Sequence, residues 1–365
     1  MSKLSRLLKS PPKALRKLVW GALSDEPLLP GSMVHVELSQ PYLDDVPDSG
    51  DVRVDANFAA KQSERGVEYI LDIRGPCMIE PGAGYTIRKP WNLQRHSLNP
   101  KCQAWKWRRP RVGWVASGWW ASRRVHHPAV ISLRDFNENN YWHFFNDVLS
   151  KLFLLDERGE YADLPLVVSG RLARMPYFVH MRETCRLLQG RELIVQDRQP
   201  VHAGRVIVVQ TQECHPRNAR FIRGEYAASQ GNTPESGERK LFITRAASGD
   251  RSPQNLDAIH RLVESRGYEV IDPGRLPFPE QIRLFGSARI VVGLHGAGLT
   301  NIMFRRGPMT LVELHSPAWT GREYFRTARR CGFAYKGLMG VAAETGRGYR
   351  FDESALAALL DQLPT

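Results

Sequence analysis

The stretch RIVVGLHGAGLTNIMFRRG, residues Arg289 to Gly307, decides the fold. It begins with an apolar run that is typical of a buried strand, passes through a histidine and closely spaced glycines, and regains apolar residues at helical spacing. A buried strand that turns directly into a helix is the unit from which parallel α/β sheets are built. The stretch therefore predicts one strand, one glycine-rich turn and one helix of such a sheet.

Similar units flank this stretch from Lys240 onward. Alternation of strands and helices at this spacing predicts a parallel sheet with right-handed crossovers, which is a Rossmann-like domain over residues 240–350. A closing amphipathic helix is expected over residues 351–365. The expected strands are KLFITR, YEVID, RIVVGL, MTLVEL and FAYKGL, and the expected helices begin at Ser252-Pro253 and at PEQIRLFGSA, GLTNIMF and REYFRTARRCG.

Residues 25–210 hold a second, less regular set of strand and helix patterns, which predicts an N-terminal domain. One of its helices is expected from about Asn139 to Arg158. Residues 211–239 are polar and rich in turn-forming residues, which predicts a linker with room for a short helix at 221–226. The expected strands of this domain are MVHVEL, VEYILDI, LPLVVSG, ELIVQD and RVIVVQ, and its second helix is YFVHMRETCRLLQG.

The formal net charge of +13 comes from two local segments. Residues 1–20 carry six Lys or Arg and residues 101–128 carry seven, and neither contains an acidic residue, so the rest of the chain is balanced. Residues 1–24 combine these charges with leucines on helical faces. That pattern predicts a segment lying on an anionic membrane surface, where each basic residue contributes about 1 kcal/mol. A solvated chain end is the alternative.

Five tryptophans interleave with the basic residues of 101–128. Aromatic rings stack on bases while arginine neutralises phosphate, so nucleic-acid binding is one interpretation. A membrane-interface loop, a surface for a phosphorylated glycan, and a basic face whose tryptophans belong to the core are the others. The balanced charge of the C-terminal half argues against nucleic acid, which we do not expect as a partner.

The remaining composition predicts a folded cytoplasmic protein. No stretch approaches the roughly 18 apolar residues of a transmembrane helix, and the N-terminus lacks the apolar core of a secretory signal. The five cysteines are odd in number and contain no Cys-x-x-Cys pair. This argues against a disulfide framework or a zinc knuckle and favours a reducing compartment.

Three side chains are expected at the carboxyl ends of neighbouring parallel strands, where ligands bind to open α/β sheets. They are Arg245, His295 and Glu313. Glycines after His295 permit a close approach of backbone to ligand, and the following helix start offers unpaired N–H groups, so a phosphate is the expected occupant. Arg251 can add a further charge, and the Glu313 carboxylate can accept from both hydroxyls of a ribose. The glycine spacing does not match a dinucleotide fingerprint or a P-loop.

A second cluster of polar residues lies in NENNYWHFFNDVLSKLFLLD, residues 137–156. On a helix, His143 and Asp147 face the same way because they are four residues apart. Asn140 and Tyr141 lie at the start of that helix. The pair can form a local hydrogen bond on a packed face, or it can supply a general base that deprotonates a hydroxyl.

These segments resemble glycosyltransferase family 61 in their order and spacing. The resemblance rests on NYWHFFNDVLSKLFLL, on LFITR followed by Arg251, and on VVGLHGAGLTN with LVEL behind it, and it runs from about Asn137 to Leu338. The family includes bacterial capsule and lipopolysaccharide enzymes and eukaryotic transferases of xylose, arabinose and N-acetylglucosamine. One departure is Leu149-Ser150-Lys151, where a Leu-Pro-Arg-like stretch is expected.

The resemblance implies an α/β protein of GT-B-like architecture, in which two Rossmann-like domains face a central cleft. It implies inversion at the anomeric carbon without a metal or a cofactor, and the donor is expected to be UDP-linked. His143 and Asp147 are the expected catalytic residues, and Asn140, Tyr141, Trp119 and Trp120 are the expected acceptor-binding residues. The expected donor-binding residues are Arg245, Arg251, His295, Gly296, Ala297, Gly298, Leu299, Asn301 and Glu313.

The sequence thus predicts a glycosyltransferase that works on the inner face of the plasma membrane. It would move a sugar from a nucleotide diphosphate to a hydroxyl of a glycan or lipid-linked glycan in the synthesis of surface polysaccharide. A non-catalytic protein that binds anionic glycans or nucleic acid through residues 101–128 is the alternative from another class. A sugar-nucleotide epimerase of similar fold is a third.

Overall fold

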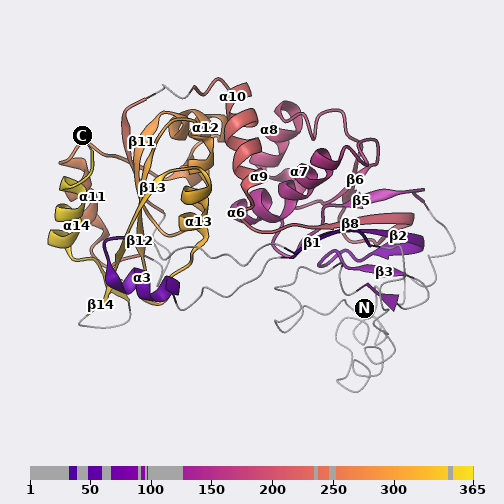
Figure 1. Cartoon of the computed structure of the whole chain (residues 1–365), viewed down its shortest axis with the longest axis horizontal. Coiled ribbons are helices and arrows are strands. Elements are labelled where there is room, and N and C mark those ends of the chain that lie inside the picture. The colour runs from indigo at the N-terminus through magenta and orange to yellow at the C-terminus, as the bar shows by residue number, and fades with distance from the viewer. Residues whose placement is uncertain are drawn as a thin grey trace, which may run out of the picture. The chain divides into compact units, whose positions relative to one another are not determined.

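The computed structural model divides the chain into two compact units (Figure 1). Unit 1 comprises residues 1–39 and 66–213, and unit 2 comprises residues 40–65 and 214–365. The structure describes residues 33–38, 48–59, 67–88, 92–94, 97, 126–233, 237–245, 252–343 and 348–364. The predicted segment 1–24, nearly all of 101–128 with Trp119 and Trp120, and Arg251 lie outside these residues.

Unit 2 contains the parallel sheet that the C-terminal half predicts. Its five strands are all parallel and follow the order β10-β9-β11-β12-β13. Numbered along the chain this order is 2-1-3-4-5, one of the two common orders of doubly wound sheets. The strands are β9 (Arg239–Ile243), β10 (Glu269–Ile271), β11 (Ala288–Leu294), β12 (Thr310–His315) and β13 (Ala334–Met339).

Helices cover both faces of this sheet (Figure 1). Apolar residues of α11 (Leu256–Glu264) and α14 (Glu353–Asp361) form one core with residues of β9, β11 and β12. On the other face α12 (Phe278–Gly286) and α13 (Glu323–Arg330) contact the 3₁₀ helix η7 (Ala297–Phe304). The short 3₁₀ turn η6 (Pro273–Arg275) and the hairpin of β14 (Val341–Ala342) and β15 (Tyr349–Arg350) complete the regular structure.

Two helices of unit 2 differ from the sequence prediction. The helix expected from Ser252 begins at Leu256, because residues 254–255 form a turn and Asn255 occupies the N-cap position. The segment GLTNIMF is a 3₁₀ helix and not an α-helix. Two glycines near its start weaken the α-helix, and the Asn301 side chain donates to the Gly298 carbonyl inside the turn, a local bond that competes with helical pairing.

One helix of unit 2 comes from early in the chain and is not predicted by the sequence. α3 (Val52–Ala59) lies beside β13, where the indigo helix meets yellow strands in Figure 1. Asp51 accepts a hydrogen bond from the Met339 N–H at 2.8 Å, and Arg53 donates to the Met339 carbonyl at 2.8 Å. Phe58 is fully buried against the rings of Phe325 and Tyr335. α3 is therefore part of the core of unit 2.

Unit 1 is built on a mixed sheet of order β4-β3-β2-β8-β5-β6-β7, with β1 paired to β2. β2 runs antiparallel to β8, whereas β8, β5, β6 and β7 are mutually parallel. Its helices include η3 (Leu172–Arg174) and α8 (Pro176–Thr184). The strands are β1 (Met33–Leu38), β2 (Val67–Ile79), β3 (Thr86–Arg88), β4 (Asn92–Leu93), β5 (Val130–Ser132), β6 (Leu166–Ser169), β7 (Leu193–Gln196) and β8 (Val201–Gln210).

The helix predicted from Asn139 to Arg158 is interrupted by a π turn. It consists of α6 (Tyr141–His143), the π segment η2 (Phe144–Val148) and α7 (Leu149–Arg158). Such π segments are rare and occur frequently at functional sites. A second π segment, η4 (Arg220–Tyr226), lies between α9 (Pro216–Ala219) and α10 (Ala227–Ser229), so the predicted linker 211–239 contains a helical run with buried side chains.

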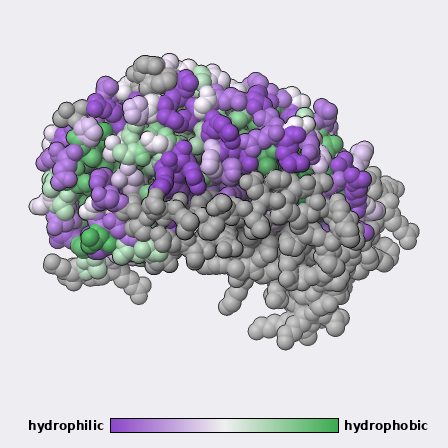
Figure 2. Space-filling model, viewed as in Figure 1, coloured by the Kyte–Doolittle hydropathy of each residue, from purple (hydrophilic) through white to green (hydrophobic). Residues whose placement is uncertain are grey.

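No helix among the described residues is long and apolar enough to cross a bilayer. On the face shown in Figure 2 the coloured residues are mostly hydrophilic, and apolar residues occur in separate spots.

The packing of α3 leads to a prediction about stability. Phe58→Ala should lower the free energy of unfolding by about 3–5 kcal/mol, because it leaves a cavity among Phe325, Tyr335 and the sheet. Val52→Ala on the same helix is the matched control, since the Val52 side chain is 81% exposed and should cost at most about 0.5 kcal/mol. Urea denaturation measures both. Equal effects would show that α3 does not belong to the core.

Candidate functional site

Unit 2 gathers polar side chains where its strand order reverses, between β9 and β11. Arg245 follows β9, and His295 follows β11. Ligands of doubly wound sheets bind outside the carboxyl ends of the strands at this switch point. We name His295, Glu313, His315, Tyr335 and Arg245 the His295 cluster.

His295 is hydrogen-bonded to the buried carboxylate of Glu313. The Nδ1 atom of His295 lies 2.5 Å from Glu313 Oε1, and the Tyr335 hydroxyl donates to Glu313 Oε2 at 2.8 Å. Glu313 is 0% exposed. Burial alone raises the pKa of Glu313, but nearby His315 and the hydrogen bonds from His295 and Tyr335 outweigh it, so this pKa lies below its usual value. Glu313 is therefore an anion whose two oxygens are bound by neighbouring side chains.

The other nitrogen of His295 is covered by Trp319. The indole Nε1–H donates to His295 Nε2 at 3.1 Å. Because an indole N–H can only donate, Nε2 carries the lone pair in this state and Nδ1–H donates to Glu313. Burial lowers the pKa of His295, yet the hydrogen bond and charge of Glu313 outweigh it and raise the pKa above its ordinary value. Protonation of His295 to the cation is therefore favoured by its surroundings.

Arg245 and the start of η7 lie beside His295. Arg245 Nη1 donates to the His295 carbonyl at 3.3 Å, and the guanidinium is 3.4 Å from where a Cβ on Gly296 would lie. Ala297 opens η7, and the first N–H groups of a helix have no partner inside it. Gly293 has a packing role, because a Cβ there would lie 2.7 Å from Leu299 Cδ2.

The remaining predicted donor-site residues are divided between this surface and the core. Gly296, Ala297 and Gly298 are partly exposed. Leu299 and Asn301 are fully buried, and Asn301 donates to the Gln281 side chain at 3.0 Å. These two residues therefore hold η7 in place and do not present side chains to a ligand.

His295, Glu313 and His315 also form a set of side chains that could hold a metal ion. One ligand atom from each lies within 4.8 Å of the others. His315 Nε2 is 2.9 Å from the Tyr335 hydroxyl and 3.5 Å from Glu313 Oε2. Both oxygens of Glu313 and this nitrogen are thus already engaged with protein groups, and His315 is 0% exposed. The donor set fits a network that shares protons better than it fits an ion.

Unit 1 carries the second cluster, formed by His143, Asp147, Asp135 and Lys151, which we name the His143 cluster. His143 Nδ1 lies 2.5 Å from Asp147 Oδ2. The His143 side chain is 25% exposed and that of Asp147 is 1% exposed. Burial lowers the pKa of His143, but Asp147 outweighs it by hydrogen bond and charge, so the pKa is raised. The imidazole is therefore the member of the pair that reaches outward.

The π segment supports this arrangement from within the helix. Asp147 lies in η2, and its Oδ1 atom is buried with no hydrogen-bond partner among the described residues. An unsatisfied buried carboxylate oxygen is costly. The hydrogen bond between Asp147 Oδ2 and His143 Nδ1 offsets part of this cost. Asn140 caps the helix start by accepting from the Trp142 and His143 N–H groups at 3.0 and 3.4 Å. Asn140 thus helps to fix the backbone that carries His143.

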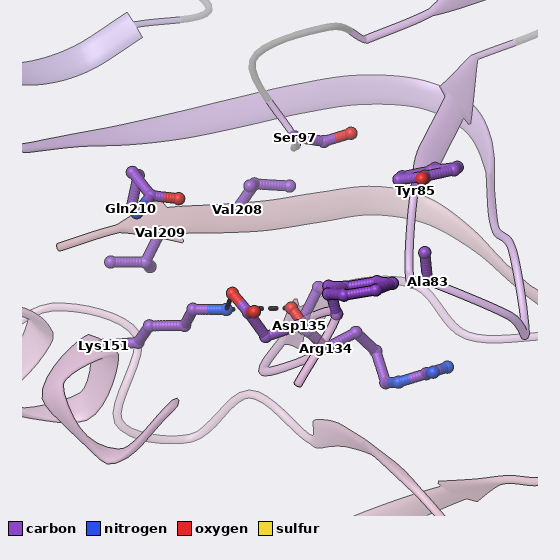
Figure 3. A pocket seen from close by; sticks show the side chains of 11 residues that line it. Ala83, Tyr85, Ser97, Arg134, Asp135, Lys151, Val208, Val209 and Gln210 are labelled. Atoms are coloured by element: carbon purple, nitrogen blue, oxygen red, sulfur yellow. Dashed lines mark hydrogen bonds and ion pairs between the residues drawn. The ribbon is translucent and has the colours of Figure 1, made fainter. Parts of the chain in front are cut away.

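Lys151 lies in the part of the motif that departs from the family pattern. It is buried, donates to the Arg134 carbonyl at 2.8 Å and lies 3.6 Å from Asp135. These groups line a pocket of unit 1 (Figure 3). Burial raises the pKa of Asp135, with Asp147 raising it further and Lys151 opposing both. Ser150 donates to the Asn146 carbonyl, a bond that proline could not make.

Tyr141, which the sequence predicts to be an acceptor-binding residue, is partly exposed at the start of α6. Its ring packs edge-on against Phe145 and Tyr177.

The sequence prediction did not include Trp319, His315 or Tyr335. A signal for His315 exists, since LVELH continues the strand beyond Glu313. Tyr335 and Trp319 have no such signal, because they reach the cluster from a different strand and from a loop.

The Lys151–Asp135 pair leads to a prediction. Lys151→Met should lower the free energy of unfolding by about 3–5 kcal/mol, because it leaves the Asp135 charge buried without its cation. The double variant Lys151→Met/Asp135→Asn should regain part of this loss. Thermal and urea denaturation measure both proteins. A double variant that is less stable than the single one would contradict the role given to Asp135.

Part of the chain is similar to known glycosyltransferases. Residues 141–312 match the family model described as glycosyltransferase 61. Over 114 residues the chain is 33% identical to alpha-1,3-arabinosyltransferase XAT3 of Oryza sativa subsp. japonica, an alignment that covers 29% of this chain and 19% of the rice protein. The chain thus spans about a fifth of the length of the curated relative that it matches. The chain is thus similar to glycosyltransferase family 61 over residues 141–312.

Proposed function

We propose that the protein is an inverting glycosyltransferase that moves a sugar from a nucleotide-diphosphate donor to a hydroxyl of a glycan or lipid-linked glycan. The observation that carries the proposal is the pairing of His295 with the buried anion Glu313 at the switch point of a parallel sheet. A histidine of raised pKa beside an arginine and a helix start is suited to a diphosphate.

In this proposal the His295 cluster binds and stabilises the leaving diphosphate. Arg245, protonated His295 and the first N–H groups of η7 are fixed donors that face the charge that develops as the donor bond breaks. Glu313 has the role of orienting His295 and holding it cationic. Its burial and its two occupied oxygens favour this role over the ribose contact expected from the sequence.

The general base is His143, and Asp147 is the residue that positions it. Asp147 holds the Nδ1 proton of His143, so Nε2 is left to accept a proton. His143 is the more exposed of the two, which favours it as the group that meets the acceptor. A histidine of raised pKa is also a stronger base when neutral.

The proposed reaction is one displacement. The acceptor hydroxyl gives its proton to His143 Nε2 while its oxygen attacks the anomeric carbon of the donor sugar. The bond from that carbon to the diphosphate oxygen breaks, and the oxygen keeps the electron pair. Attack from the face opposite the leaving group inverts the configuration. Arg245 and His295 supply the charge that a metal ion supplies elsewhere, so no metal and no cofactor is required in this proposal.

The proposed biological setting rests on two features of the sequence. The basic segment 1–24 and the family resemblance favour an enzyme at the cytoplasmic face of the membrane that builds surface polysaccharide. The donor is proposed to be UDP-linked. Because the rice relative is named an arabinosyltransferase, UDP-linked pentoses belong among the donors to be tested.

The donor site leads to a prediction about pH. UDP binding should be strong at low pH and should be lost as pH rises through the raised pKa of His295, because the cation is the form that binds the diphosphate. Glu313→Gln removes the charge that raises this pKa, so the loss should occur at lower pH. His295→Ala should weaken binding at least tenfold at pH 6, since a charge-assisted hydrogen bond contributes about 1.5–3 kcal/mol.

Calorimetry in the presence of EDTA measures these affinities and also reveals any metal requirement of the wild type. Tyr335→Phe is the matched control, because it removes a hydrogen bond to the same carboxylate and leaves the charge. Its pH profile should stay close to that of the wild type. If folded Glu313→Gln protein showed the same pH dependence of UDP binding as the wild type, this result would contradict the role given to Glu313.

The base assignment leads to a separate prediction about turnover. kcat should rise as pH rises through the raised pKa of His143, because only the neutral imidazole accepts a proton. Asp147→Asn removes the negative charge and should move this rise to lower pH. His143→Ala should lower kcat by about 100- to 10,000-fold. His180→Ala, which changes a histidine of α8, serves as the control. Near-normal turnover in folded His143→Ala would exclude His143 as the base.

A further inference from the structure

Trp319 is an exposed aromatic side chain at the edge of the His295 cluster. It is 64% exposed, whereas the next most exposed large apolar aromatic among the described residues, Phe136, is 39% exposed. Tryptophan is highly buried on average, so a ring left in solvent calls for an explanation. It lies in the loop between β12 and α13, directly after the strand that carries Glu313 and His315.

The loop holds this ring in a defined position. The backbone N–H of Trp319 donates to the Ser316 carbonyl at 3.0 Å, and the backbone N–H of Ala318 donates to the Ser316 hydroxyl at 3.3 Å. At the tip of the side chain, Nε1–H donates to His295 Nε2 at 3.1 Å. The indole is thus anchored at both ends next to His295, while most of its surface faces solvent.

The hydrogen bond between the Trp319 indole and His295 can form only while His295 Nε2 is unprotonated. When Nε2 carries a proton and donates to a phosphate, it can no longer accept from the indole N–H. Phosphate binding therefore releases the indole, which is then free to reorient over another part of the same ligand. The nearest exposed residues of the loop, Pro317 and Ala318, have no side-chain donor or acceptor for sugar hydroxyls. The nucleobase is the flat ring of a nucleotide sugar, and it is the part of that ligand that stacks best on the face of an indole.

We propose that Trp319 is the base-stacking residue of the donor site, which exchanges its hydrogen bond with His295 for the face of the nucleobase when the donor binds. This inference rests on the proposed function. Aromatic stacking tolerates any base, because every base has a π face. Trp319 therefore contributes affinity for a nucleotide and little preference among uracil, cytosine and guanine.

Calorimetry with UDP, CDP, GDP and inorganic pyrophosphate tests this. Trp319→Ala should weaken binding of all three nucleotides by roughly 5- to 150-fold, the range measured for stacking of one base. Pyrophosphate has no base, and the variant frees His295 Nε2, so its affinity should be equal to or higher than in the wild type. Trp319→Phe keeps a ring without the N–H and should retain most of the nucleotide affinity.

Phe136→Ala, an exposed aromatic of unit 1, is the matched control and should change none of these affinities. Equal weakening of pyrophosphate and UDP by Trp319→Ala would mean that Trp319 acts only through His295, and unchanged UDP affinity would mean that it does not stack; either result overturns the proposal. Weakening of a UDP-sugar without weakening of UDP would place the sugar on the ring and overturn it too. A wild-type protein that binds no nucleotide would refute the proposed function itself, whereas the other failures appear only in the variant.

Discussion

A carboxylate buried beneath a histidine is the interaction on which the geometry of the His295 cluster depends. An isolated charge at 0% exposure would be prohibitively costly, so Glu313 must be surrounded by donors. The register of the sheet brings these donors to Glu313. Glu313 of β12 lies opposite Gly293 of β11, and Gly293 is two residues before His295. On its other side Glu313 pairs with Gly337 of β13, two residues beyond Tyr335. The strand register thus determines the partners of the carboxylate.

Unit 1 uses the same pairing of a buried carboxylate with a less buried imidazole, but it builds the pair differently. His143 and Asp147 are neighbours on one helical segment, whereas His295 directly follows β11 and Glu313 lies in β12. Asp147 lies in the π turn η2, and His143 directly precedes it at the end of α6. A similar electrostatic effect, a raised histidine pKa, therefore has two unrelated structural origins.

The sequence predicts the sheet of unit 2 well because each of its strands is a short apolar run between helices. It also brings Arg245, His295 and Glu313 to one edge, since the carboxyl ends of parallel strands meet there. It does not reveal that Glu313 points at His295, because that depends on side chains from β13 and from the loop after β12. The π turn and the 3₁₀ form of η7 have no clear sequence signal either. The relative placement of two Rossmann-like domains about a cleft and the roles of the site residues stay predictions.

The position of α3 in the core of unit 2 has a consequence for biosynthesis. Asp51 pairs with Met339, so 288 residues separate two groups that must meet before unit 2 is complete. At ribosomal rates of about 5–20 residues per second, β13 emerges roughly 15–60 s after α3. During this time Phe58 has no core to enter. The Phe58 side chain therefore stays without its packing partners while residues 66–213 of unit 1 are synthesised.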